Sequence, residues 1–83
     1  MQTPAEQYLD ALVSLELAAI CARLEGRPIS AAIRATSSAL QRRITDSKIL
    51  FILRGLASQT FPAGALAMMR RQLDSMVGGL IWN

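Results

Sequence analysis

The chain has 83 residues, of which 52% are apolar and 18% charged, and its formal net charge is +3. This length suits one domain, whose core is marginal without a disulfide, a metal ion or association with another chain. A single cysteine and the absence of histidine exclude an internal disulfide and a structural zinc site, so association remains as the means of support.

The sequence favours a cytoplasmic, bacterial protein. The first residues lack the basic start and apolar run of a signal peptide, and no apolar stretch approaches the length that crosses a bilayer. The lone Cys21 suits a reducing compartment. Arginine and alanine are abundant, which is typical of a GC-rich bacterial genome and carries no information on function.

The first predicted helix spans residues 4 to 25. Thr3 is a natural N-cap, Pro4 suits the first helical position, and Glu6 completes a capping box three residues after the threonine. Gly26 is a common helix stop, so the helix is expected to end just before it.

A second helix is predicted from residue 31 to about residue 44, with Ser30 as its N-cap. Residues 45–47 then form either a break, in which Asp46 caps a third helix over residues 47–58, or a polar patch in one long helix. We favour the break, although neither glycine nor proline enforces it.

A fourth helix is predicted to begin at Pro62 and to end near Val77, before Gly78 and Gly79. Strand-forming residues are scarce, so we expect an all-α fold: a three- or four-helix bundle in one domain over residues 1–83, assembled as a homodimer or higher oligomer. The apolar stripe of this helix has helical spacing and consists of Leu66, Met69, Leu73, Met76, Val77 and Leu80.

The apolar face predicted for the first helix includes two charged side chains, Glu16 and Arg23. An unpaired charge inside such a face would cost several kcal/mol. Either both charges find partners across a helix–helix or subunit interface and fix its register, or both lie at the rim with only their stems covered. At 100° per residue the predicted face comprises Leu9, Leu12, Glu16, Ala19, Ile20 and Arg23.

The fourth helix carries three methionines and precedes the only tryptophan. Methionine-rich surfaces adapt to varied partners and tryptophan is frequent at binding hot spots, although the same residues can simply fill a small core. We predict that the protein binds itself and another protein through its first and fourth helices. The predicted interface residues are Leu12, Glu16, Ala19, Arg23, Leu66, Met69, Leu73, Met76 and Trp82.

The alternative function is DNA binding by a helix-turn-helix in Ser30–Ile44. Residues 36–44 would be the recognition helix, with Arg42 and Arg43 on phosphates. The preceding helix would be short and no glycine or asparagine marks the turn, so a single amphipathic helix explains the segment more simply. A continuous helix through residues 45–47 would leave no helix-turn-helix.

Three smaller features have simple structural interpretations. Arg70, Arg71 and Asp74 are expected to form a solvated charge cluster one helical turn long. Cys21 is expected to be a buried, inert hydrophobe. The run Ile49–Leu53 could touch an anionic membrane surface, but an all-round apolar helix is more often the centre of a bundle.

The sequence offers no basis for catalysis. No histidine is present to act as a base, and the six acidic residues form neither an ExxE nor a DxD arrangement. We therefore expect neither an enzyme nor a bound cofactor or metal. The predicted function is a small protein-binding module, namely an adaptor, a secretion-type chaperone or a regulatory inhibitor, with DNA binding as the alternative and membrane binding least favoured.

Overall fold

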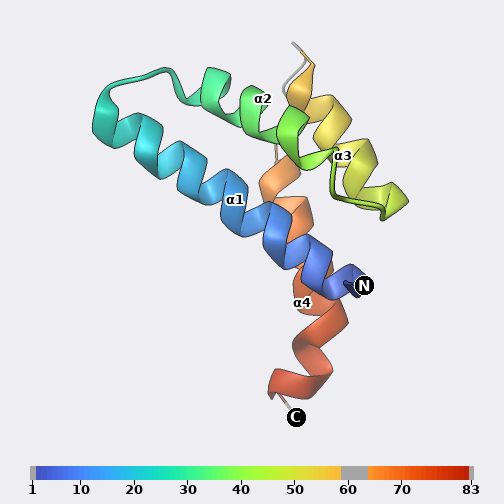
Figure 1. Ribbon diagram of the computed structural model, residues 1–83. Helices are drawn as coiled ribbons and strands as arrows, with labels where there is room; N and C mark the ends of the chain where they lie inside the picture. Colours follow the sequence, from blue (N-terminus) through green and yellow to red (C-terminus); the bar gives the residue numbers. More distant parts are fainter. Residues whose placement is uncertain (1, 59–63, 83) are drawn as a thin grey trace.

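The computed structural model of the chain describes residues 2–58 and 64–82, with side chains as far as residue 78 in the second segment. The described residues form helices and no strands, which confirms the predicted all-α fold. The helices are α1 (Pro4–Glu25), α2 (Ile29–Leu40), α3 (Ser47–Ala57) and α4 (Ala65–Trp82). Figure 1 shows α1 crossing in front of α4, with α2 and α3 above α1 in this view.

Helix α1 begins and ends as its local sequence predicts. The Thr3 hydroxyl accepts the amide of Glu6 at 3.2 Å, and the Glu6 carboxylate accepts the amide of Thr3 at 3.0 Å, which completes the capping box. Gly26 follows the last turn with a φ of 69°, the left-handed conformation that glycine adopts without a steric penalty.

The predicted break between the second and third helices is confirmed. The Asp46 carboxylate accepts the amides of Lys48 and Ile49 at 3.0 and 3.1 Å and so caps α3. The boundaries predicted for α2 are wrong at both ends. It begins at Ile29, directly after Pro28, so Ser30 lies inside the first turn and does not cap it.

Helix α2 ends at Leu40 rather than near Ile44, and Gln7 of α1 binds the backbone that leads on into α3. The side-chain oxygen of Gln7 accepts the amides of Thr45 and Asp46 at 2.9 and 3.0 Å. Because both amides have hydrogen-bond acceptors outside a helix, residues 45 and 46 can leave the helical conformation without losing hydrogen bonds. The sequence gives no local indication of this contact, which joins residues 38 and 39 positions apart.

The helix-turn-helix considered as the alternative for residues 30–44 is not formed. The break at residues 45–47 left that interpretation open, but residues 30–35 and 36–40 belong to the single helix α2. The segment therefore provides no separate recognition helix of the kind that enters a major groove.

Helix α4 is longer than predicted at its C-terminal end. It begins at Ala65 and continues through Gly78 and Gly79 to Trp82, whereas the sequence predicted an end near Val77. Glycine ends a helix where it adopts a positive φ, and among the described glycines only Gly26 and Gly64 do so. The predicted start at Pro62 lies outside the described residues.

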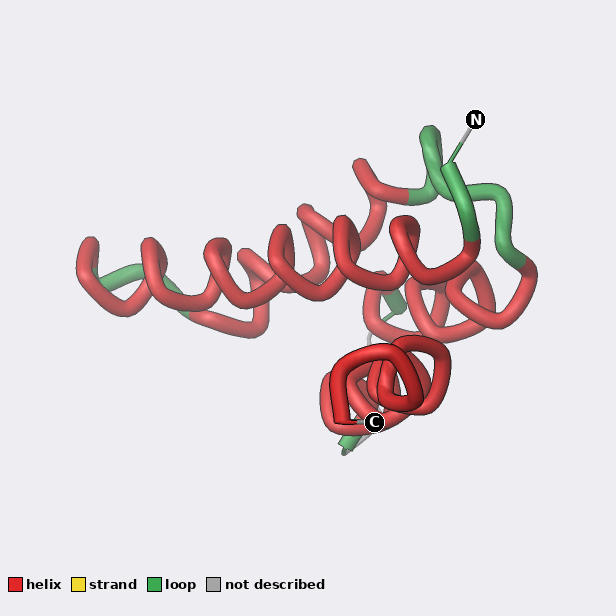
Figure 2. The backbone as a smooth tube through the Cα atoms, turned by 90° about the horizontal axis from the view of Figure 1, so that it is seen from below, coloured by secondary structure: helices red, strands yellow, loops and turns green. Residues whose placement is uncertain are grey.

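The core lies where α1 meets the three other helices. Its largest fully buried side chains include Tyr8, Leu15, Leu53 and Met69, which come from α1, α3 and α4. Helix α1 packs most extensively on α2 and then on α4. In Figure 2, α4 is seen almost along its axis below α1, and Figure 1 shows its C-terminal half continuing past the crossing.

The buried face of α1 is displaced by one residue from the predicted face. The buried positions include Tyr8, Ala11, Leu15 and Ala22, whereas the prediction used the positions one residue later, except that Leu12 is buried as predicted. Apolar side chains surround this helix, so periodicity alone does not select the covered side. The displacement keeps the two charged side chains of the predicted face out of the core.

Two ion pairs flank α1 and join it to its neighbours. Arg43 donates to both carboxylate oxygens of Asp10 at 2.8 and 2.9 Å and to the hydroxyl of Ser14 at 3.2 Å. On the other flank, Glu16 pairs with Arg70 of α4. The local cluster predicted for Arg70 and Asp74 is therefore wrong, because Arg70 reaches across to another helix.

A search of the described residues for candidate membrane spans finds no helix with the required length and hydropathy.

Candidate protein-binding groove

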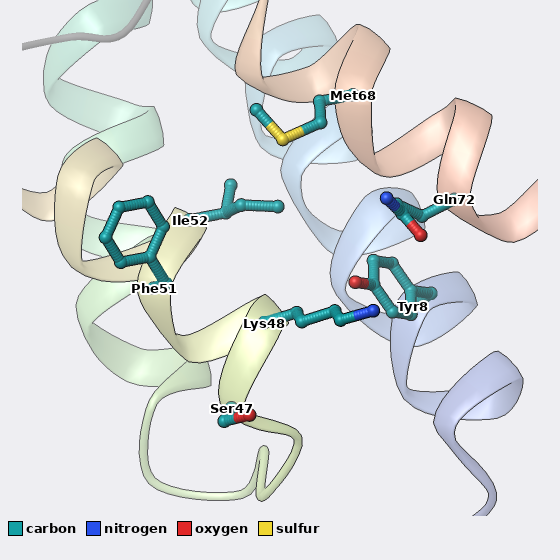
Figure 3. A pocket seen from close by; sticks show the side chains of 7 residues that line it. All are labelled: Tyr8, Ser47, Lys48, Phe51, Ile52, Met68 and Gln72. Atoms are coloured by element: carbon teal, nitrogen blue, oxygen red, sulfur yellow. The ribbon is translucent and has the colours of Figure 1, made fainter.

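An apolar groove lies between α3 and α4. Its two adjoining parts have volumes of about 300 and 470 Å³ and share Phe51, Ile52 and Met68. Figure 3 shows the first part, with side chains contributed by α1, α3 and α4. The remaining lining residues are Tyr8, Ser47, Lys48 and Gln72 in the first part, and Arg54, Gly55, Ser58 and Ala65 in the second.

Helix α3 forms one wall because only one of its faces is covered. Ile49, Ile52, Leu53 and Leu56 are buried, at a spacing of three, one and three residues. Phe51 lies off this stripe and is 77% exposed. The prediction that this segment is the centre of the bundle is therefore wrong: α3 packs on one side and presents an aromatic ring on the other.

Helix α4 forms the opposite wall through neighbouring methionines with different environments. Met69 is fully buried in the core, whereas Met68 is 41% exposed and lines both parts of the groove. Gln72, one turn further along α4, adds an amide to the first part. A flexible, polarizable methionine side chain can adjust to more than one apolar shape in such a position.

Tyr8 of α1 lies at the base of the groove. The residue is fully buried, and its hydroxyl makes no hydrogen bond to any described residue. In Figure 3 the hydroxyl points from α1 toward α3. Burial raises the pKa of the Tyr8 hydroxyl above its ordinary value, and the negative charge of Asp46 raises it further. The hydroxyl therefore keeps its proton at neutral pH and can donate it in a hydrogen bond.

The charged side chains of the groove are basic. Lys48 and Arg54 belong to α3 and are exposed, and no acidic side chain is among the described residues that line either part. The groove thus combines apolar walls with positive charge from two residues of one wall, an arrangement that favours an apolar ligand with acidic neighbours.

Several of the predicted interface residues belong to the interior of this chain. Leu12 and Met69 are buried, and Ala19, Leu66 and Leu73 pack partly buried against the core. Side chains in these positions stabilise the fold and present little surface to another protein. The assignment of Leu12 and Met69 as interface residues is therefore corrected to core, whereas for Ala19, Leu66 and Leu73 a contact with a partner stays a prediction.

The other predicted interface residues have more exposed environments. Glu16 makes the ion pair with Arg70 across a helix–helix contact, as one interpretation of its position expected. Arg23 is exposed and forms no ion pair within the described part of the chain, and Met76 is 39% exposed. The side chain of Trp82 lies outside the described residues. Whether any of these residues contacts a partner stays a prediction.

Arg42, Arg43 and Cys21 also occupy positions that differ in part from expectation. Arg42 is exposed, but Arg43 is held by Asp10, which raises the pKa of its guanidinium through the hydrogen bonds that Asp10 accepts. Arg43 is therefore bound to a carboxylate of its own chain. Cys21 is exposed rather than buried.

Sequence reasoning missed most of the groove, including Tyr8, Lys48 and Phe51. Phe51 could have been found from the sequence, because the stripe of buried residues in α3 leaves it on the uncovered side. Tyr8 could not, because the apolar positions of α1 do not distinguish its two faces. Residues 2–58 and 64–82 contain no cluster of three or more His, Cys, Asp or Glu residues that could hold a metal ion.

Comparison with known proteins places the chain in one family. The family described as "Domain of unknown function (DUF7740)" matches residues 6–74. The chain belongs to this family. The match covers α1, α2, α3 and the N-terminal half of α4, and thus includes every residue of the groove. No curated protein and no solved structure matches the sequence.

Proposed function

We propose that this protein is a binding module that holds an apolar, acid-flanked segment of another protein in the groove between α3 and α4. The observation that carries the proposal is the buried Tyr8 hydroxyl, which lacks a partner among the described residues and lies at the base of an apolar groove. A buried hydroxyl without an acceptor costs about 1–3 kcal/mol. A backbone carbonyl or carboxylate of a bound segment would remove that cost.

The walls and charges of the groove support the same ligand class. Phe51 and Met68 offer exposed apolar surface on opposite sides, which suits one or two large apolar side chains of an amphipathic helix. Lys48 and Arg54 would attract acidic residues beside those anchors. This chemistry fits an adaptor, a chaperone or a regulatory inhibitor, and it requires no catalytic group.

We also propose that the protein works as a homo-oligomer in the bacterial cytoplasm. The small size of the core favours self-association. An exposed thiol at Cys21 remains reduced most readily in a reducing compartment. Oligomerisation and ligand binding are separate parts of this proposal and are tested separately.

The groove is tested by selecting binders from a random peptide library displayed on phage. We expect enriched peptides with large apolar residues at helical spacing and with flanking Asp or Glu. Fluorescence titration of a selected peptide should show at least tenfold weaker binding for Phe51→Ser, about 1.4 kcal/mol, and weaker binding for Lys48→Glu. Tyr8→Phe should weaken binding, and it should stabilise the free protein by about 1 kcal/mol because it removes the buried hydroxyl that lacks an acceptor.

Leu24→Ser is the matched control, because Leu24 is an exposed apolar residue that does not line the groove. It should leave peptide binding unchanged. The proposal would be refuted if no peptide were enriched, or if the enriched peptides bound the Phe51→Ser and Tyr8→Phe variants as tightly as the original chain.

A further inference from the structure

The outer side of α1, turned away from the core, carries a continuous apolar stripe. At 100° per residue its members fall within an arc of about 80° on the side opposite Tyr8 and Leu15. Their exposed fractions range from 44% to 83%, so no described helix covers them. The stripe, called the outer stripe of α1 below, consists of Leu9, Val13, Leu17, Ile20 and Leu24.

The spacing within the outer stripe is that of a two-helix seam. Val13, Leu17, Ile20 and Leu24 are separated by four, three and four residues, the alternation found at the a and d positions of coiled coils. A helix that is apolar on all sides is normally covered on all sides, whereas α1 is covered on one. The uncovered stripe therefore has the form of a surface that another helix covers.

We infer that the outer stripe of α1 docks antiparallel on the same stripe of a second copy of this chain. The inference deepens the self-association in the proposed function and rests on it. The order of residue types reads almost the same in both directions: Leu, β-branched, Leu, β-branched, Leu. In an antiparallel pair, Leu9 faces Leu24 of the second copy, Val13 faces Ile20, and Leu17 lies near its own counterpart, as a two-fold interface requires.

The charges of α1 also select the antiparallel arrangement. Its N-terminal half contains Glu6 and Asp10, whereas its C-terminal end carries Arg23 together with Glu25, which pairs with Arg27 just beyond the helix, so the two ends have opposite net charge. Antiparallel pairing brings Glu6 to the level of Arg27 of the second copy. Parallel pairing would instead place like charges together and align the two helix dipoles.

The acids nearest to the middle of the stripe are already neutralised within the chain. Asp10 on one flank is paired with Arg43, and Glu16 on the other flank is paired with Arg70. These two carboxylates therefore do not oppose the approach of a second copy. Arg23, exposed and without an ion pair among the described residues, becomes available to the second copy.

The area is sufficient for a modest dimer. Covering five exposed aliphatic side chains on each of two copies removes on the order of 1,000 Å² from water, the lower limit for a specific interface. The groove between α3 and α4 lies away from this stripe, and the two share no lining residue. One dimer would thus present two grooves.

Sedimentation equilibrium of the full chain tests the inference. The chain mass is 9.0 kDa, so we expect a species of twice that mass at micromolar concentration. Leu17→Glu and Leu17→Lys should each be monomeric, with dissociation constants raised about a hundredfold or more, and an equimolar mixture should again form dimers. Leu17 is exposed, so circular dichroism should show an unchanged helical content for both variants.

Phe51→Glu is the matched control, since Phe51 is exposed in the groove and absent from the stripe; this variant should remain dimeric. Retained peptide binding by Leu17→Glu, together with loss of the dimer, would separate the two surfaces. A monomeric original chain, or a dimer unaffected by Leu17→Glu, would overturn the inference and leave the groove proposal standing.

Disulfide trapping tests the direction of the helices. In a Cys21→Ser background, chains carrying Val13→Cys should cross-link to chains carrying Ile20→Cys when the two are mixed and oxidised. Val13→Cys alone should give little cross-linked product. Efficient linking of Val13→Cys to itself would contradict the antiparallel arrangement.

Discussion

Gln7 stabilises the turn between α2 and α3 from the neighbouring helix α1. It is nearly fully buried and combines the two backbone contacts of its carbonyl with an amide donation to the hydroxyl of Thr45 at 3.0 Å. A polar side chain is tolerated there because its hydrogen-bonding groups have partners. One residue thereby holds the backbone at Asp46, which caps α3.

Replacing Gln7 by alanine should therefore destabilise the fold. Two backbone amides would lose their acceptor in a part-buried turn, and we expect a loss of about 2–3 kcal/mol in the free energy of unfolding. Urea unfolding followed by circular dichroism measures this change. Gln41→Ala is the control: Gln41 makes one long hydrogen bond of 3.4 Å to its own helix, and its loss should cost no more than about 0.5 kcal/mol.

Ser37 shows the opposite situation at the same scale. Its side chain is fully buried in α2, and its hydroxyl has no partner among the described residues. Ser37→Ala removes the unsatisfied hydroxyl and adds helix propensity, whereas Ser38→Ala at the exposed neighbouring position adds propensity alone. The free energy of unfolding of Ser37→Ala should therefore be about 1 kcal/mol higher than that of Ser38→Ala. Equal or reversed effects in the same urea assay would argue that the hydroxyl finds an acceptor.

At the scale of the elements, α1 is fixed on each flank by an ion pair, and the Asp10 pair makes stability depend on pH. Hydrogen bonds from Arg43 lower the pKa of the Asp10 carboxyl below its ordinary value of 3.8, more than burial raises it. Since the folded-state pKa is the lower one, the unfolded chain takes up the proton first as the solution is acidified. The stabilisation is complete above about pH 5 and disappears as the pH falls through the folded-state pKa.

Asp10→Asn should flatten this dependence. Between about pH 5 and pH 2.5 we expect the original chain to lose about 1 kcal/mol more than the variant, a modest value because Arg43 is largely exposed. Urea unfolding at several pH values provides the comparison. Asp74→Asn, an exposed change on α4 outside any described ion pair, should leave the slope intact; an equal flattening by both variants would contradict the role given to Asp10.

At the scale of the whole molecule, the sequence predicted those features that depend on neighbouring residues. The capping box of α1, its stop at Gly26 and the cap at Asp46 all involve residues within four positions of one another. The contact of Gln7 with Thr45 and Asp46 was not predicted, because these residues are distant in sequence but adjacent in space.

The candidate groove was largely beyond prediction for a related reason. Helix α1 is apolar on both sides, so only the packed structure decides that Tyr8 faces inward and Leu9 outward. Self-association through Leu12, Glu16, Ala19 and Arg23 of the first helix stays a prediction, and the fourth-helix stripe includes core residues. A one-residue shift turns a helix by about 100° and exchanges covered for uncovered side chains.

The central position of α1 has a consequence for synthesis. It emerges from the ribosome first, yet α4, which covers one of its sides, begins 40 residues after Glu25. At translation rates of roughly 5–20 residues per second, α4 is synthesised on the order of seconds after α1. During this time the apolar side chains of α1 that α4 later covers stay exposed. The nascent chain therefore passes through a stage that is prone to aggregation, in which general cellular chaperones would have their main opportunity to bind it.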